Sequence, residues 1–147
     1  MPIKTPTHAS VNILLSKINR MSDIAHFFTP VDLENITGQL NYNPTQLGSL
    51  IQTYSSNSDF PDLEGIDVAL IGVCESRNAE NNDACKLAPN EVRSFLYPLY
   101  NGGFNLQLVD LGNILPGHST NDTYFALRSV VDALVRKNII PIRSEER

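Results

Sequence analysis

The polar residues best placed for chemistry stand in two loops that each follow an apolar run. Asn81 and Asn82 lie in the loop 74–87, behind the run 67–73, and His118 lies in the loop 113–120, behind the run 106–109. In open α/β sheets the ligand crevice lies beyond the carboxyl ends of the strands. Asn81, Asn82 and His118 are therefore candidates for the rim of a pocket. The competing interpretation is that the asparagines form local turns and the histidine is solvated, and we favour it because loop polar residues do this more often.

The other residues with chemical potential are predicted to serve the structure. Arg93 is expected to reach from its helix to carbonyls or a carboxylate in the neighbouring loop. Asp110 stands before the glycine turn at Gly112 and is expected to accept backbone N–H bonds of that turn. Cys74 and Cys85 have no histidine close in sequence to activate a thiol, and we expect both to be reduced. The sequence predicts no catalytic residue and no metal ligand.

The elements that must position these residues form one β-α-β unit over 67–113. The apolar run 67–73 is typical of a strand covered on both faces, which indicates a parallel sheet. A helix is predicted to open at Ala88-Pro89, because proline in the first turn loses no hydrogen bond. One apolar face of this helix is predicted from the spacing of Val92, Phe95, Leu96 and Leu99. The run 106–109 then forms the second strand.

A second helix and a third strand are predicted after this unit. Ser119 to Asp122 offer several N-cap residues, and Arg136, Lys137 and Asn138 suit the C-terminal end of the helix. The residues at 139–142 begin the third strand. The broad apolar face expected for this helix comprises Phe125, Leu127, Val130, Val131, Leu134 and Val135.

The residues before the unit are predicted to be an accessory lead-in. Residues 1–20 form a tail with an amphipathic stretch at 11–18, or an over-extended start upstream of Met21. Residues 21–65 are a helical lead-in, with one short helix through Phe28 and another from Pro44 to about Tyr54. The second helix is expected to pack on the edge of the sheet.

Composition limits the classes of function. The chain has 147 residues, of which 41% are hydrophobic and 18% charged, as in an ordinary globular domain. A net charge of −5 argues against a nucleic-acid partner, since phosphate binding needs clustered Lys and Arg. No apolar run is long enough to cross a bilayer, so no membrane partner is predicted and the cytoplasm is the expected location.

An ordered set of segments resembles the N-terminal part of the arginase–agmatinase–formimidoylglutamase superfamily, and the formimidoylglutamase-like members most closely. This resemblance implies the first part of a three-layer α/β/α sandwich with a parallel sheet, of which about three strands are present. It also implies two manganese ions in the full-length enzyme, holding a hydroxide that attacks a guanidinium or formimino carbon. The segments are 66–73, 81–85, Ala88-Pro89-Asn90-Glu91-Val92-Arg93, Val109-Asp110-Leu111-Gly112-Asn113-Ile114, 122–127 and 139–142.

The metal ligands of that superfamily are missing from this sequence. The family takes them from a histidine after a Gly-Gly, from an Asp-x-His-x-Asp segment and from an Asp-x-Asp segment. The histidines here are His8, His26 and His118, and none of the three patterns occurs. We therefore expect no cofactor in this chain, no hydrolysis by it alone, and a small-molecule substrate only in an intact enzyme.

A separate prediction concerns the last residues of the chain. Residues 66–142 are predicted to be a truncated arginase-like domain, and 143–147 an aberrant end that puts charge where an apolar strand should continue. A frameshift after Ile142 would explain it, because suitable codons read one base earlier spell Ile-Gly-Gly-Thr. The uncompleted sheet predicts self-association through its open edge. The alternative is a small non-catalytic α/β module that binds a protein partner along that edge.

Overall fold

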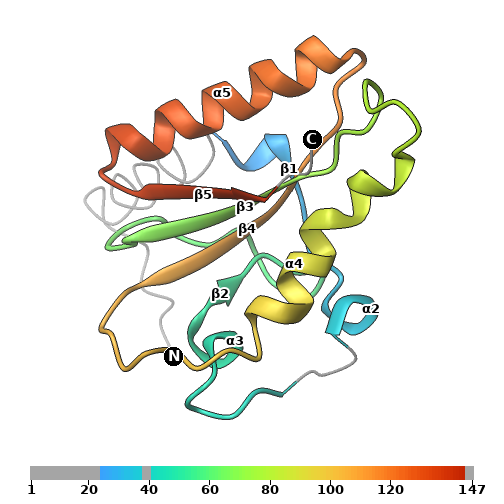
Figure 1. Cartoon of the computed structure of the whole chain (residues 1–147). Helices are drawn as coiled ribbons and strands as arrows, with labels where there is room; N and C mark the ends of the chain where they lie inside the picture. Colours follow the sequence, from blue (N-terminus) through green and yellow to red (C-terminus); the bar gives the residue numbers. More distant parts are fainter. Residues whose placement is uncertain (1–23, 38–40, 145–147) are drawn as a thin grey trace, which may run out of the picture.

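A five-stranded, mostly parallel sheet is the centre of the molecule. The computed structural model describes residues 24–37 and 41–144. The strands β3 (Val68–Val73), β4 (Leu108–Ile114) and β5 (Ile140–Ser144) are mutually parallel, and the order across the sheet is β1-β4-β3-β5. Figure 1 shows helix α5 (Thr120–Arg136) on one side of these strands and α4 (Ala88–Leu96) on the other. The prediction of an α/β fold with a parallel sheet is confirmed at this level.

The main hydrophobic core lies between the sheet and α5. Alternate residues of β3 point to this face, namely Ala69, Ile71 and Val73, as expected from the period of two in a strand. Helix α5 supplies Leu127 and Val130 to the same core. Phe125 and Val135, predicted for the apolar face of this helix, are instead 68% and 56% exposed. The buried stripe of α5 is therefore narrower than its sequence suggests.

Helix α5 begins at a capping box. The Ser119 side chain accepts a hydrogen bond from the Asp122 backbone N–H, and the Asp122 carboxylate accepts one from the Ser119 backbone N–H. These two contacts satisfy N–H groups that have no partner within the helix. The predicted N-cap region is confirmed, and the cap residue is Ser119.

Helix α4 is turned differently from the prediction. It opens with Pro89 near its first position, as predicted, but the side chains that it buries are Pro89 and Arg93. Its apolar residues Val92 and Phe95 are 41% and 75% exposed. Leu99, predicted for the same helical face, lies beyond the end of α4 and is 55% exposed. The physical reason is that the helix is oriented by a buried polar contact of Arg93 with β4, described below. Of the predicted apolar face, Val92 and Leu96 line an open groove.

The segment before β3 contains strands as well as helices. The short elements are the 3₁₀ helix η1 (Ala25–Phe27), β1 (Phe28–Thr29), α2 (Leu33–Thr37), α3 (Leu47–Leu50) and β2 (Gln52–Thr53). The helix predicted to reach Tyr54 thus ends at Leu50, and the helix predicted through Phe28 ends in strand β1. Both strands pair with the free edge of β4, β2 beside Val109 and Asp110 and β1 beside Asn113 and Ile114. The described residues therefore form five strands, where about three were predicted.

An apolar groove of about 690 Å³ lies between α4 and the sheet. It is bordered by β5, whose exposed side chains Ile140 and Ile142 share the sheet face of Val68 and Leu70. No strand lies beyond β5 in the part of the chain that the structure describes. Residues lining the groove include Leu47, Leu50, Val68, Leu70, Val92, Leu96, Tyr100, Phe104, Leu106 and Ile142.

The predicted ends of the chain are only partly visible. The tail 1–20 lies outside the described residues. Of the end predicted to be aberrant, Arg143 and Ser144 belong to β5, and 145–147 lie outside the described residues. Among the helices described, none has the length and apolar character needed to cross a membrane.

Candidate functional site

The most buried polar contact joins α4 to β4. Arg93 donates from Nε to Asp110 Oδ2 at 2.7 Å and from Nη2 to Asp110 Oδ1 at 2.9 Å, a bidentate pair. Both side chains are almost fully buried. Burial alone lowers the pKa of the Arg93 guanidinium, but the hydrogen bonds and charge of Asp110 raise it above its ordinary value. The Arg93 guanidinium is therefore held in its charged form.

Arg93 uses all of its donors within the protein. Its Nη1 donates to the side-chain oxygens of Asn113 at 2.7 Å and Asn90 at 3.3 Å, and its Nη2 also donates to the Gly112 carbonyl at 3.0 Å. A guanidinium has five N–H donors, and these contacts together with the two to Asp110 use five. Arg93 therefore has no donor left for a bound substrate.

Asp110 is held from three directions. Besides Arg93, it accepts from the Gly112 backbone N–H at 2.9 Å and from the Tyr97 hydroxyl at 2.8 Å. The Tyr97 hydroxyl also lies 3.1 Å from the Thr53 hydroxyl. Burial, followed by the charge of Asp110, raises the pKa of Tyr97 well above its ordinary value. The tyrosine stays protonated and serves as a donor.

Two glycines allow the strands to approach at this site. Gly112 has a φ of +86°, and a Cβ there would lie 2.2 Å from the Thr29 carbonyl oxygen of β1. A Cβ on Gly72 of β3 would lie 2.0 Å from Asn113 Oδ1. Since a side chain at either position would displace backbone or a hydrogen-bonded amide, glycine is required by the close packing.

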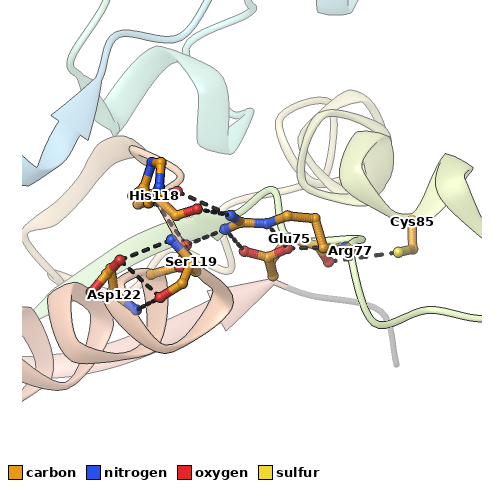
Figure 2. A network of polar contacts seen from close by, with 8 residues as sticks. Glu75, Arg77, Cys85, His118, Ser119 and Asp122 are labelled. Atoms are coloured by element: carbon orange, nitrogen blue, oxygen red, sulfur yellow. Dashed lines mark hydrogen bonds and ion pairs between the residues drawn. The ribbon is translucent and has the colours of Figure 1, made fainter.

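A second arginine joins the two loops at the carboxyl ends of the strands. Arg77 forms an ion pair with Glu75, and it donates to the backbone carbonyls of Gly117 and His118, both at 3.0 Å (Figure 2). It also donates to the Thr123 hydroxyl at 2.9 Å. The hydrogen bonds with Arg77 lower the pKa of Glu75 from 4.5 to about 2. The loop 74–87 is thereby fastened to the start of α5.

The three residues predicted for a pocket rim have different surroundings. His118 is exposed and enters the Arg77 network through its backbone carbonyl, as Figure 2 shows. Asn81 has a φ of +56°, in the left-handed region that asparagine tolerates in turns. Asn82 is the N-cap of the 3₁₀ helix η2 (Asp83–Leu87). The loops of these residues do meet at one edge of the sheet, and Arg77 is the contact that joins them.

The cysteines are not paired with each other. Cys74 is half-buried at the end of β3, and burial raises the pKa of its thiol despite the positive charge of Arg93. Cys85 is buried, and its Sγ lies 3.7 Å from the Glu75 carbonyl oxygen. A raised pKa leaves less thiolate at neutral pH, and the thiolate is the nucleophile. The surroundings of Cys74 therefore disfavour nucleophilic catalysis.

The chemistry available at this edge of the sheet is that of a scaffold. Within residues 24–37 and 41–144, no group of three or more His, Cys, Asp and Glu side chains is arranged to hold a metal ion. Arg77, like Arg93, donates to five acceptors of the protein itself, counting both contacts with Glu75 Oε1 and Oε2. The sequence pointed to Arg93 and Asp110 but not to Arg77. The signal that could have identified Arg77 is Glu75, an oppositely charged residue two positions earlier, just after the buried strand β3.

Fold and site together define a mixed α/β protein with a mostly parallel sheet. Arg93 braces α4 against β4, and Arg77 joins the loops that follow β3 and β4. Comparison with known proteins goes no further: no family model, curated protein or solved structure matches the chain.

Proposed function

We propose that this chain is the first part of an arginase-superfamily hydrolase, of the formimidoylglutamase-like kind, which acts on C–N bonds of guanidino or formimino substrates. In this proposal the chain supplies scaffold and the intact enzyme supplies the dimanganese centre. The chain alone binds no substrate productively and hydrolyses nothing.

One contact supports the proposal above all, the buried pair of Arg93 and Asp110. These residues come from two separate segments of the resemblance, Ala-Pro-x-x-Val-Arg and Asp-x-Gly. Their bidentate contact gives a physical reason for both segments to be present. Gly112 of the Asp-x-Gly segment contacts both residues of the pair, because its N–H donates to Asp110 and its carbonyl accepts from Arg93.

The place of this contact also suits the proposal. From Asp110 inside β4, Arg93 reaches on to Gly112 and Asn113, toward the carboxyl end of the strand, and α/β enzymes bind their ligands beyond those ends. Arg93 and Arg77 are saturated with protein acceptors, so they would brace the loops around a catalytic centre without touching the substrate. Two metal ions would supply the activated hydroxide in the intact enzyme, through oxygen and imidazole ligands from other segments.

The decisive experiment is to sequence the natural transcript beyond the codon of Ile142 in all three frames. We expect a Gly-Gly followed by a histidine, then Asp-x-His-x-Asp, then Asp-x-Asp. Absence of these patterns from every frame would overturn the proposal. Manganese binding by the purified chain provides an independent check, because stoichiometric binding measured by equilibrium dialysis would contradict the claim that this chain holds no ligand set.

A second candidate function is that of a non-catalytic module. Such a module would bind a protein partner, or a second copy of this chain, along the open edge of its sheet. The observation in its favour is the apolar groove beside β5, with Ile140 and Ile142 exposed at 63% and 51%. An edge strand with apolar side chains is a template for pairing with another chain. Sedimentation velocity over a hundredfold range of concentration tests it: a protein that stays monomeric throughout would count against self-association.

A further inference from the structure

The turn that follows α4 contains an asparagine directly before a glycine, Asn101-Gly102. Glycine follows no other asparagine in the sequence. Because glycine has no Cβ, its backbone nitrogen is unshielded and can close a succinimide ring on the side chain of the preceding asparagine. Asn101 is partly exposed and Gly102 is exposed, so water reaches both residues. The turn therefore has the residue types and the access to water that asparagine deamidation requires.

The nucleophile of this reaction is the backbone nitrogen of Gly102 after loss of its proton. Within residues 24–37 and 41–144, the Gly102 N–H has no hydrogen-bond partner. The N–H groups on either side are both engaged, since Asn101 donates to the Thr45 carbonyl at 2.9 Å and Gly103 donates to Asn101 Oδ1 at 2.9 Å. The nitrogen that must attack is thus the one that the turn leaves open to solvent.

The electrophile is the side-chain carbonyl carbon of Asn101, Cγ. Attack on this carbon turns Oδ1 into an oxyanion, and the Gly103 N–H already donates to that oxygen at 2.9 Å. A donor fixed at this distance stabilises the negative charge that develops there. The Asn101 Nδ2 atom, which departs, donates to the Pro44 carbonyl at 3.3 Å. The turn therefore holds both the oxygen that gains charge and the nitrogen that leaves.

We propose that Asn101-Gly102 is a self-modifying site, at which Asn101 is converted to aspartate and isoaspartate. The Gly102 nitrogen loses its proton to solvent and bonds to Asn101 Cγ, and the bond from Cγ to Nδ2 breaks as Nδ2 takes up a proton and leaves as ammonia. Water then opens the succinimide at either carbonyl, which gives aspartate or isoaspartate. Water is the only co-reactant. The inference is independent of the hydrolase proposal, because it concerns the chemistry of this turn alone.

The modification removes a contact between the end of α4 and the segment before α3. The Asn101 amide is a donor to the Pro44 carbonyl, whereas a carboxylate at this position is a second acceptor facing that carbonyl. Isoaspartate also reroutes the backbone through the side chain of residue 101. Close by, the Leu47 N–H donates to the Leu99 carbonyl at 2.9 Å. Both products therefore loosen the attachment of α3 to the end of α4.

The apolar groove shares this part of the structure. Leu47 and Leu50 of α3 line the groove, as do Asn101 and Gly102 of the turn. Release of α3 from the turn would therefore expose more apolar surface at this end of the groove. The site thus acts as a slow, irreversible change that opens the groove as the protein ages.

Peptide mapping of the intact chain tests the reaction. Asn101 and Asn105 lie in one tryptic peptide, 94–128, and Asn105 is an exposed control that leucine follows. The folded protein is incubated at neutral pH in oxygen-18 water, so that only new carboxylates carry the label. We expect position 101 to gain labelled acid at least tenfold faster than position 105, as a mixture of aspartate and isoaspartate. Equal rates at the two positions, or aspartate without isoaspartate, would overturn the proposal.

The contribution of the folded turn is measured by repeating the incubation in guanidinium chloride. The unfolded chain keeps the Asn-Gly pair but loses the fixed contact of the Gly103 N–H with Asn101 Oδ1. We expect Asn101 to react at least as fast in the folded chain as in the unfolded chain. Slower reaction in the folded chain would show that the turn protects Asn101, against the proposal.

Hydrogen exchange tests the structural consequence. Asn101→Asp imitates one product, and Asn105→Asp adds the same charge in the same loop as the matched control. We expect amide exchange at 46–50 to rise at least tenfold in Asn101→Asp only, with exchange in α5 unchanged. No rise, an equal rise in both variants, or a rise that extends to α5 would contradict a local release of α3.

Discussion

Arg93 and Asp110 form a bidentate ion pair that is almost completely shielded from water, with Nε–Oδ2 and Nη2–Oδ1 distances of 2.7 and 2.9 Å. It orients α4 so that Arg93 is buried toward β4 while Val92 and Leu96 line the groove. One polar contact thus explains why α4 leaves apolar side chains exposed.

Removing one partner of this pair should be strongly destabilising. Asp110→Asn leaves the buried Arg93 charge without a counter-ion, and breaking a buried pair in this way costs about 3–5 kcal/mol. The control Asp132→Asn lies on the exposed side of α5 and should change stability by less than about 0.5 kcal/mol. Urea unfolding followed by circular dichroism gives both values. Equal effects of the two substitutions would contradict the importance of the pair.

Glu75 should make stability sensitive to acid. Its folded pKa of about 2 is below the ordinary value of 4.5, so its contribution is complete above about pH 4.5 and is lost as pH falls towards 2. Glu75→Gln should therefore flatten the decline in unfolding free energy over that window. Arg77→Gln removes the same interaction from the other side and should flatten it similarly. If the unfolding free energy of the Arg77 variant fell with pH as steeply as that of the wild type, the contact with Arg77 would not be the cause of the acid sensitivity.

Gly112 should not tolerate a side chain. Gly112→Ala combines a φ of +86° with a Cβ 2.2 Å from the Thr29 carbonyl oxygen. Gly65→Ala is a matched control, because Gly65 has a φ of +75° but no atom within 4 Å of the added Cβ. We expect about 1–2 kcal/mol of destabilisation for Gly65→Ala from the backbone alone. Thermal unfolding should show a distinctly larger loss for Gly112→Ala, and equal losses would mean that β1 moves aside without cost.

The open edge of the sheet should respond to charge. Ile142→Lys places a positive charge on β5, where the native side chain is half-exposed, and charged side chains on edge strands oppose pairing. Phe125→Lys is the control, since Phe125 is an exposed apolar residue on α5, on the other side of the sheet. We expect Ile142→Lys to weaken self-association at least tenfold in sedimentation velocity, with little effect of the control. The same association for both variants would exclude β5 as the contact.

The sequence alone determined strand β3 and helix α5, because apolar runs and helical spacing report burial directly. It located only the start of β4, since the strand predicted over 106–109 covers Leu108–Ile114 and takes in Asn113 of the predicted loop. Five residues carry the rest of the agreement. Pro89 and Ser119 stand at helix starts, and Arg93 of α4 contacts Asp110 and Gly112 where the register of β4 shifts. The roles of most of these residues can be predicted from their sequence neighbours, as for a hydroxyl that caps a helix or a carboxylate that precedes a glycine.

Tertiary structure decided the remainder. Strands β1 and β2 have two residues each and exist because the free edge of β4 accepts them, which no local pattern encodes. The exposure of Val92 and Phe95 follows from the buried polar contact of Arg93, 17 residues before its partner. The contact of Arg77 with the loop 40 residues later depends on two strands ending at one edge. Such contacts join residues distant in sequence, so only the packed sheet determines them.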